Sequence, residues 1–120
     1  MLETSCHCGN VQIKTAVKIE TVNSCNCSAC LRFGTLWAHL DPKVVTITYD
    51  DNDLGSYCWG DKTITFHHCK NCACITHYTP TDIGNKDRMA INFRLAPKDM
   101  LDAVTVRYFD GADTWEYIEQ

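Results

Sequence analysis

A chain of 120 residues with 45% hydrophobic and 22% charged residues can form one domain with its own core, and this composition argues against disorder. Its formal net charge of −4 would repel a phosphate backbone, which argues against nucleic acid as a partner. No stretch approaches the ~20 apolar residues of a membrane span, and the first residues lack the basic start and apolar run of a secretory signal. We therefore expect a single domain over residues 1–120 that is cytoplasmic, with neither a membrane nor a nucleic-acid partner.

Short stretches of the sequence alternate apolar or β-branched residues with polar ones, which is the period-two pattern of strands. Gly, Asn, Asp and Pro residues separate them at the positions of tight turns. The pattern predicts an all-β fold of mainly antiparallel short strands, with one helical turn at 97–101, and it places Trp59 and Trp115 in the core. The predicted strands include 11–15, 44–48, 63–67 and 104–108.

Nine cysteines in a chain expected to be cytoplasmic need an explanation, because thiols stay reduced in that compartment. Dense cysteine usage there indicates metal binding or catalysis. Disulfides would become the alternative if the protein were secreted. The cysteines are clustered along the sequence, and this clustering favours metal ligands.

The first candidate site combines two pairs of cysteines. Cys6 and Cys8 would point to the same face of an extended segment, and Cys69 and Cys72 form the C-x-x-C pair best suited to complete a tetrahedral shell. We expect these four residues to hold a structural zinc, which would close a loop of about sixty residues and remove a few kcal/mol of chain entropy. Cys74 could compete with Cys69 for this metal, and buried cysteines without metal are the alternative reading.

The second candidate site is Cys25, Cys27 and Cys30, three thiols close enough in sequence to face one ion. No fourth ligand is obvious, so a second zinc here would keep one position open for water or substrate. A distant residue such as Cys74, Cys58 or a histidine could instead close the shell.

The remaining candidates receive weaker roles. Cys58 lies beside aromatic residues and is expected to be buried and inert. His67 and His68 should point to opposite faces of a strand, so at most one of them would approach a metal. The isolated histidines, His39 among them, are expected to be ordinary core or surface residues.

The order of these motifs resembles that of the glutathione-dependent formaldehyde-activating enzyme family, and the resemblance spans most of the chain. It implies a small all-β zinc fold called the β-tent, which is also found in centromere protein V and, more remotely, in methionine sulfoxide reductase B. It also implies a structural zinc at the first cysteine group and a zinc associated with catalysis at the second. The residues that carry the resemblance are Cys6-x-Cys8-Gly9, Cys25-x-Cys27-Ser28-x-Cys30-x-Arg32, Tyr57-x-Trp59-Gly60, and Phe66 before Cys69-x-x-Cys72.

Three positions depart from the family pattern. Ala73 stands where the family usually has Gly, Leu31 where a basic residue is common, and Asn26 where His is frequent. Without a basic residue at position 31, attraction for the carboxylates of glutathione would be weaker.

The residues and the resemblance together predict a zinc-dependent carbon–sulfur lyase acting on a thiol adduct, such as the S-hydroxymethylglutathione formed from glutathione and formaldehyde. A thiol on the second zinc would lose its proton near neutral pH and add to a carbonyl carbon. A donor would have to stabilise the developing alkoxide, and the sequence does not identify it; Arg32 and Ser28 are merely neighbours of the cluster. The alternative is a non-enzymatic zinc-binding module with both zincs structural. A thiol redox enzyme would need Cys58 or Cys74 as its reactive cysteine, and neither has an electropositive setting.

Overall fold

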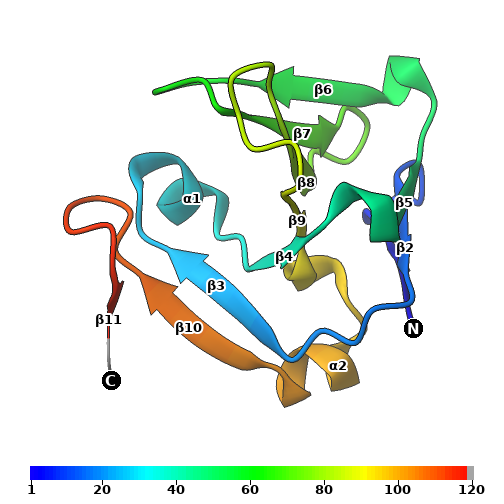
Figure 1. The fold of residues 1–120 in the computed structure, drawn as a ribbon. Helices are drawn as coiled ribbons and strands as arrows, with labels where there is room; N and C mark the ends of the chain where they lie inside the picture. Colours follow the sequence, from blue (N-terminus) through cyan, green and yellow to red (C-terminus); the bar gives the residue numbers. More distant parts are fainter. Residues whose placement is uncertain (119–120) are drawn as a thin grey trace.

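The computed structural model describes residues 1–118, which form two sheets of short strands and a few short helices (Figure 1). The smaller sheet has the order β1 (Leu2–Ser5), β2 (Gln12–Thr15) and β5 (Val45–Thr48). The larger sheet has the order β11 (Tyr117–Ile118), β10 (Thr105–Phe109), β3 (Thr21–Cys25), β4 (Trp37–Leu40), β9 (Met89–Asn92), β8 (Ile75–Pro80), β7 (Ile64–Cys69) and β6 (Leu54–Tyr57).

The prediction of a mostly β protein is confirmed, and all four predicted strands are present. They correspond to β2, β5, β7 and β10, with ends that differ by one or two residues from those predicted. The pairing is mainly antiparallel, as expected. One pair differs, because β10 runs parallel to β3, with Phe109 opposite Cys25. This long-range pairing brings the C-terminal part of the described chain to the second cysteine group.

The predicted helical turn at 97–101 is confirmed as α2 (Lys98–Ala103), which begins after Pro97. A second helix, α1 (Ser28–Phe33), was not predicted. Its first turn is capped by the Cys27 sulfur, which accepts a hydrogen bond from the Cys30 N–H, and Gly34 ends it with φ 68°. Three 3₁₀ turns complete the chain: η1 (Pro42–Val44), η2 (Asp51–Asp53) and η3 (Phe93–Leu95).

Three groups of buried side chains hold these elements together. The largest joins the two sheets and includes Ile13, Ile91 and Phe93. Each large apolar side chain buried there contributes about 1.5–3 kcal/mol relative to leaving it exposed. A second, aromatic group packs around Trp37 behind α1, and a small third group surrounds Cys6. Both cysteine groups therefore sit on packed structure.

No helix among the described residues is long and apolar enough to span a membrane.

Candidate metal centres and the adjoining pocket

The structure brings the cysteines together in two groups, each of which could bind a metal ion. The sulfur atoms within each group all lie within 4.8 Å of one another. These groups have the same membership as the two predicted from the sequence. They are the closed group, Cys6, Cys8, Cys69 and Cys72, and the trio, Cys25, Cys27 and Cys30.

The closed group has the dimensions of a tetrahedral thiolate site. The Cys8 sulfur lies 3.7 Å from that of Cys6 and 3.5 Å from that of Cys69. Four sulfurs at the usual ~2.3 Å from zinc would be about 3.8 Å apart along each edge of the tetrahedron. The Val11 N–H also points at the Cys6 sulfur, 3.3 Å away, and such a bond stabilises a thiolate.

A tight turn between β7 and β8 fixes the second half of the closed group. The Ala73 N–H donates to the Cys69 carbonyl at 2.8 Å, and the Cys69 N–H donates to the Cys74 carbonyl at 3.0 Å. Ala73 adopts φ 67°, a left-handed conformation that favours glycine. Burial raises the pKa of Cys72, but hydrogen bonds from the backbone of Cys74 and Cys8 and from the neighbouring thiols outweigh it and bring the pKa to about 5.

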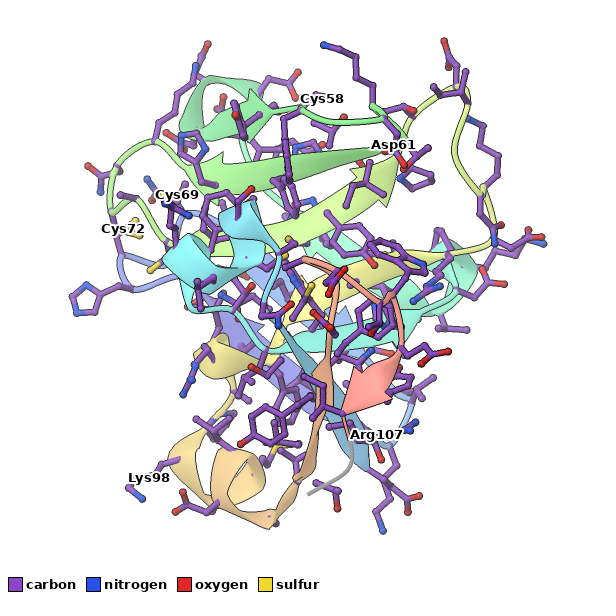
Figure 2. The ribbon with its side chains drawn as sticks, turned by 90° about the vertical axis from the view of Figure 1, so that its left-hand side faces the viewer. Cys58, Asp61, Cys69, Cys72, Lys98 and Arg107 are labelled. Carbon is purple, nitrogen blue, oxygen red and sulfur yellow. The ribbon has the colours of Figure 1, made fainter. Side chains whose placement is uncertain are left out.

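The structure answers the question of competition for the first metal. Cys74 takes part in the turn through its carbonyl and is not a member of the closed group. Cys58 lies apart from Cys69 and Cys72 (Figure 2), and its thiol donates to the Ile64 carbonyl at 3.3 Å. Cys58 is half-buried rather than fully buried.

The trio is assembled where β3 ends and α1 begins. Cys25 is the last residue of β3, Cys27 caps the helix, and Cys30 lies in its first turn. Each sulfur accepts a hydrogen bond from an N–H group. The Cys27 N–H donates to Cys25 at 3.4 Å, the Cys30 N–H to Cys27 at 3.3 Å, and the Trp37 indole N–H to Cys30 at 3.3 Å. Among residues 1–118, no further cysteine, histidine or carboxylate joins these three sulfurs.

Two sulfurs of the trio, those of Cys25 and Cys30, are joined by a hydrogen bond. A hydrogen bond from Cys30 lowers the pKa of Cys25 to about 6, and the same bond, with burial, raises the pKa of Cys30. A cation placed among these sulfurs would take the place of the proton in that bond, because metal coordination deprotonates a thiol outright. The donor set therefore fits a soft or borderline metal ion.

The trio opens into a pocket of about 650 Å³, which falls in the size range of small-molecule sites. None of the closed group lines it. All three tryptophans of the chain do, together with Phe66 and other aromatic side chains. Trp37 is buried, but Trp59 and Trp115 are 38% and 69% exposed, so the prediction that these two lie in the core was wrong. They lie at the pocket, where the loops after β6 and β10 carry them.

The loop between β10 and β11 lies directly against the trio, and Figure 1 shows it beside α1. A Cβ added at Gly111 would fall 2.6 Å from the Cys25 sulfur, so only glycine fits without movement. Asn26 holds this loop. Its amide nitrogen donates to the Asp110 carboxylate at 3.1 Å, and its oxygen accepts from the Ala112 N–H at 3.0 Å. Asn26 thus ties the trio segment to the loop that covers it.

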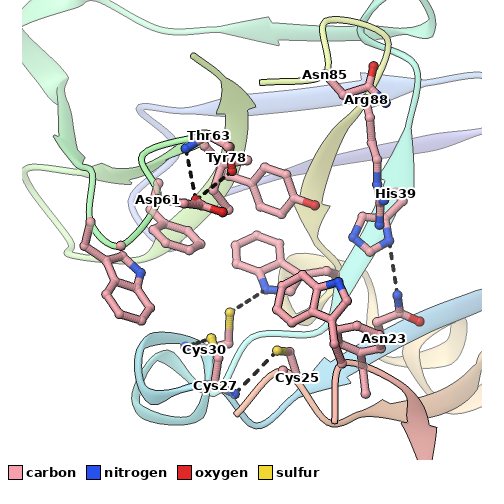
Figure 3. A pocket seen from close by; sticks show the side chains of 18 of the residues that line it. Asn23, Cys25, Cys27, Cys30, His39, Asp61, Thr63, Tyr78, Asn85 and Arg88 are labelled. Atoms are coloured by element: carbon pink, nitrogen blue, oxygen red, sulfur yellow. Dashed lines mark hydrogen bonds between the residues drawn. The ribbon is translucent and has the colours of Figure 1, made fainter. Parts of the chain in front are cut away.

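A polar wall of the pocket contains residues that the sequence did not single out. Tyr78, His39 and Arg88 lie there, on β8, β4 and just before β9 (Figure 3). Arg32 and Ser28, the neighbours of the trio in sequence, are not part of it. They are exposed, and the Arg32 guanidinium donates to the Ser28 carbonyl at 2.9 Å.

The fold is similar to that of a crystal structure of a Rhodobacter sphaeroides protein, a Northeast Structural Genomics target, with a TM-score of 0.70. The two chains are 24% identical, and the match covers 88% of this chain and 99% of the other. A likeness at this identity shows a shared fold. No protein-family model matches the chain, and no curated protein matches it.

Proposed function

We propose that the protein is a zinc-dependent carbon–sulfur lyase with the β-tent fold of the formaldehyde-activating enzymes. It would join a small thiol such as glutathione to formaldehyde, or release formaldehyde from the S-hydroxymethyl adduct. One observation carries the proposal. The three sulfurs that no fourth ligand from residues 1–118 joins line the 650 Å³ pocket, whereas the closed group of four does not. Structural zinc sites are closed, and catalytic ones keep an accessible position.

The donor sets support zinc at both groups. Four thiolates make a structural zinc site, and three thiolates leave room for one exogenous ligand. A zinc ion held by Cys25, Cys27 and Cys30 would supply Lewis acidity, which makes a substrate thiol a thiolate near neutral pH. Three thiolates give that site a net charge of −1. The N–H groups aimed at the three sulfurs, including the Trp37 indole, spread this charge over neighbouring dipoles.

The walls of the pocket would orient the thiol substrate and exclude water from it. Phe66 stacks on Trp37 with their ring centroids 5.9 Å apart, forming an apolar floor next to Cys30. Trp115, which also lines the pocket, packs edge-on against Phe109 with their ring centroids 5.1 Å apart. Such walls bury the apolar part of a small thiol and keep its adduct away from bulk water.

Metal content and exchange kinetics test the proposal together. The wild-type chain should bind two zinc ions, and Cys27→Ser should bind one with the fold retained, because it removes a ligand of the trio alone. By NMR, wild-type protein should accelerate the exchange of formaldehyde with a small thiol, and Cys27→Ser should not. Cys58→Ser is the matched control, since Cys58 belongs to neither group, and it should keep both zincs and the exchange rate.

Two results would contradict the proposal. Wild-type protein purified without chelators that holds no zinc would remove its basis. Two bound zincs without acceleration for any small thiol would favour the non-enzymatic zinc module instead. Cobalt substitution separates these cases, because an open trio should change its cobalt spectrum when a thiol is added and a closed site should not.

A further inference from the structure

The polar wall of the pocket combines three side chains that offer hydrogen-bond donors. Tyr78 stands next to the floor of the pocket, with its ring centroid 5.0 Å from that of Trp37. The ring of His39 is 6.0 Å from that of Tyr78, and Figure 3 shows the Arg88 side chain extending toward His39. All three line the same pocket as the cysteine trio.

The hydrogen bonds of His39 determine which nitrogen carries its proton. The Asn23 amide nitrogen lies 3.2 Å from His39 Nδ1 and donates its other hydrogen to the Tyr117 hydroxyl at 2.9 Å. His39 Nδ1 therefore accepts, and the proton of the neutral ring is on Nε2. Burial, with the charge of Arg88, lowers the pKa of His39 to about 4, so the ring stays neutral at physiological pH. The free nitrogen of His39 is a donor.

The Tyr78 hydroxyl also keeps its proton and can donate a hydrogen bond. Its side chain is almost fully buried, and burial raises the pKa of the phenol to about 12. The neighbouring Arg88 acts in the opposite direction and makes the hydroxyl a better donor than burial alone would. Tyr78 also belongs to the same cluster of buried side chains as Cys30, a member of the trio.

Arg88 brings a positive charge that no carboxylate within residues 1–118 pairs with, and its side chain hydrogen-bonds that of Tyr78. The ion pairs found within residues 1–118 involve lysines only, and Arg88 is in none of them. Asp61 is the carboxylate on the pocket lining, and its oxygen already accepts from the Thr63 N–H at 3.2 Å and the Thr63 hydroxyl at 2.9 Å. The guanidinium is thus available to a ligand.

We propose that Tyr78, His39 and Arg88 form a binding site for a negatively charged oxygen of the substrate. Two donors and a cation on one wall match an acceptor with negative charge, because charge-assisted hydrogen bonds are the strong ones. This inference rests on the proposed function for the position of the sulfur, which would lie at the trio. The oxygen can come from two sources. It is a carboxylate of the thiol substrate, or it is the carbonyl oxygen that becomes an alkoxide during addition.

The second source has a balanced reaction. The thiol sulfur, after its proton has gone to solvent, forms a bond with the carbonyl carbon, and the carbonyl π electrons move to the oxygen. That oxygen accepts hydrogen bonds from Tyr78 and His39 and then takes up one proton from solvent, giving a hydroxymethyl thioether. In the reverse direction the same donors hold the oxygen until the carbon–sulfur bond breaks. No oxidant or reductant is required.

Tryptophan fluorescence can measure binding at this site without turnover, since all three tryptophans line the pocket. The probes are 3-mercaptopropionate and 3-mercaptopropionamide, which differ in charge and hardly in shape, added to zinc-loaded protein. If the oxygen is a carboxylate, wild type should bind the acid about tenfold more tightly than the amide, which is the scale of one charge-assisted hydrogen bond. Arg88→Gln and Tyr78→Phe should each remove most of this preference. Arg32→Gln, an arginine outside the pocket, should retain it.

If the oxygen is that of the carbonyl, the two probes should bind with equal affinity, and the substitutions should change the rate of formaldehyde exchange instead. Tyr78→Phe should then slow formaldehyde exchange with uncharged 2-mercaptoethanol at least tenfold, with the dissociation constant for that thiol unchanged. The proposal is overturned if Arg88→Gln and Tyr78→Phe alter neither the probe preference nor the exchange rate. If wild-type protein catalyses no formaldehyde exchange, the proposed function fails. Equal binding of the two probes would then also overturn the proposed oxygen site, as a separate result.

Discussion

Gly111 offers a sharp test of how the trio is built, because one methyl group at this position would reach the Cys25 sulfur. In Gly111→Ala the new Cβ would fall 2.6 Å from the Cys25 sulfur and 3.3 Å from the Cys27 Cβ. Non-bonded carbon contacts have their optimum near 3.5–4.0 Å, so the sulfur or the loop must move by about 1 Å. A metal site tolerates changes of only about 0.2 Å in its ligand distances.

We therefore expect Gly111→Ala to weaken zinc binding at the trio by about tenfold or more, while the closed group keeps its ion. The measurement is zinc per chain after dialysis against a weak chelator, with the cobalt spectrum as a second readout. Gly60→Ala is the matched control. Gly60 lines the same pocket and has no atom within 4 Å of its would-be Cβ, so this variant should keep two metals despite the strain of its φ of +66°.

The reasoning would be refuted if Gly111→Ala held two zincs with wild-type affinity and an unchanged cobalt spectrum. In that case the covering loop would have moved instead of Cys25. The Asn26 bonds to this loop would then be too weak to fix its position.

Three further changes have expected outcomes. Ala73→Gly should raise the free energy of unfolding of the zinc-loaded chain in urea by about 1 kcal/mol, because Ala73 adopts φ 67°. The control Ala103→Gly, at the end of α2, should instead lower it by about 0.5–1 kcal/mol. An equal effect of the two changes would contradict this prediction. Trp37→Phe should weaken metal binding at the trio about tenfold by removing the N–H bond to Cys30, with the closed group unaffected in a competition titration. Asn26→Ala should loosen the covering loop and speed amide hydrogen exchange there, and unchanged protection would show that Asn26 is not what holds it.

Much of the fold could be predicted because strand patterns are local. The alternation of apolar and polar residues, as from Thr105 to Phe109, predicts a strand whatever its partner strand is. The helix α1 was missed for a physical reason. It has six residues, and its N-cap is the sulfur of Cys27 rather than the Ser, Thr, Asp or Asn oxygen that signals a helix start. The parallel pairing of β10 with β3 leaves no mark in either strand, since register between distant segments depends on the whole sheet.

The two cysteine groups were predictable and the polar wall was not. C-x-C and C-x-x-C spacings bring together the sulfurs within each pair and within the trio, which is a local property. The closed group also needs two pairs about sixty residues apart to meet, and the tetrahedral shell of a zinc site was the reason to join them. His39 and Arg88 meet only because β4 pairs with β9, with His39 opposite Ala90. Neither residue belongs to a motif. Ala73 is a further residue whose conformation its own sequence does not reveal, because it adopts the left-handed backbone that favours glycine.

The trio and the β10–β11 loop that lies against it are far apart in sequence, and this has a consequence for synthesis on the ribosome. The closed group is complete once residue 72 has emerged, whereas the loop that meets the trio begins at Asp110. At about 5–20 residues per second, the intervening ~40 residues take roughly 2–8 seconds to make. During that interval a metal in the closed group can already tie β7 to the N-terminal segment, while the trio is still uncovered. A metal bound at the closed group would thus link these segments before the pocket around the trio is assembled.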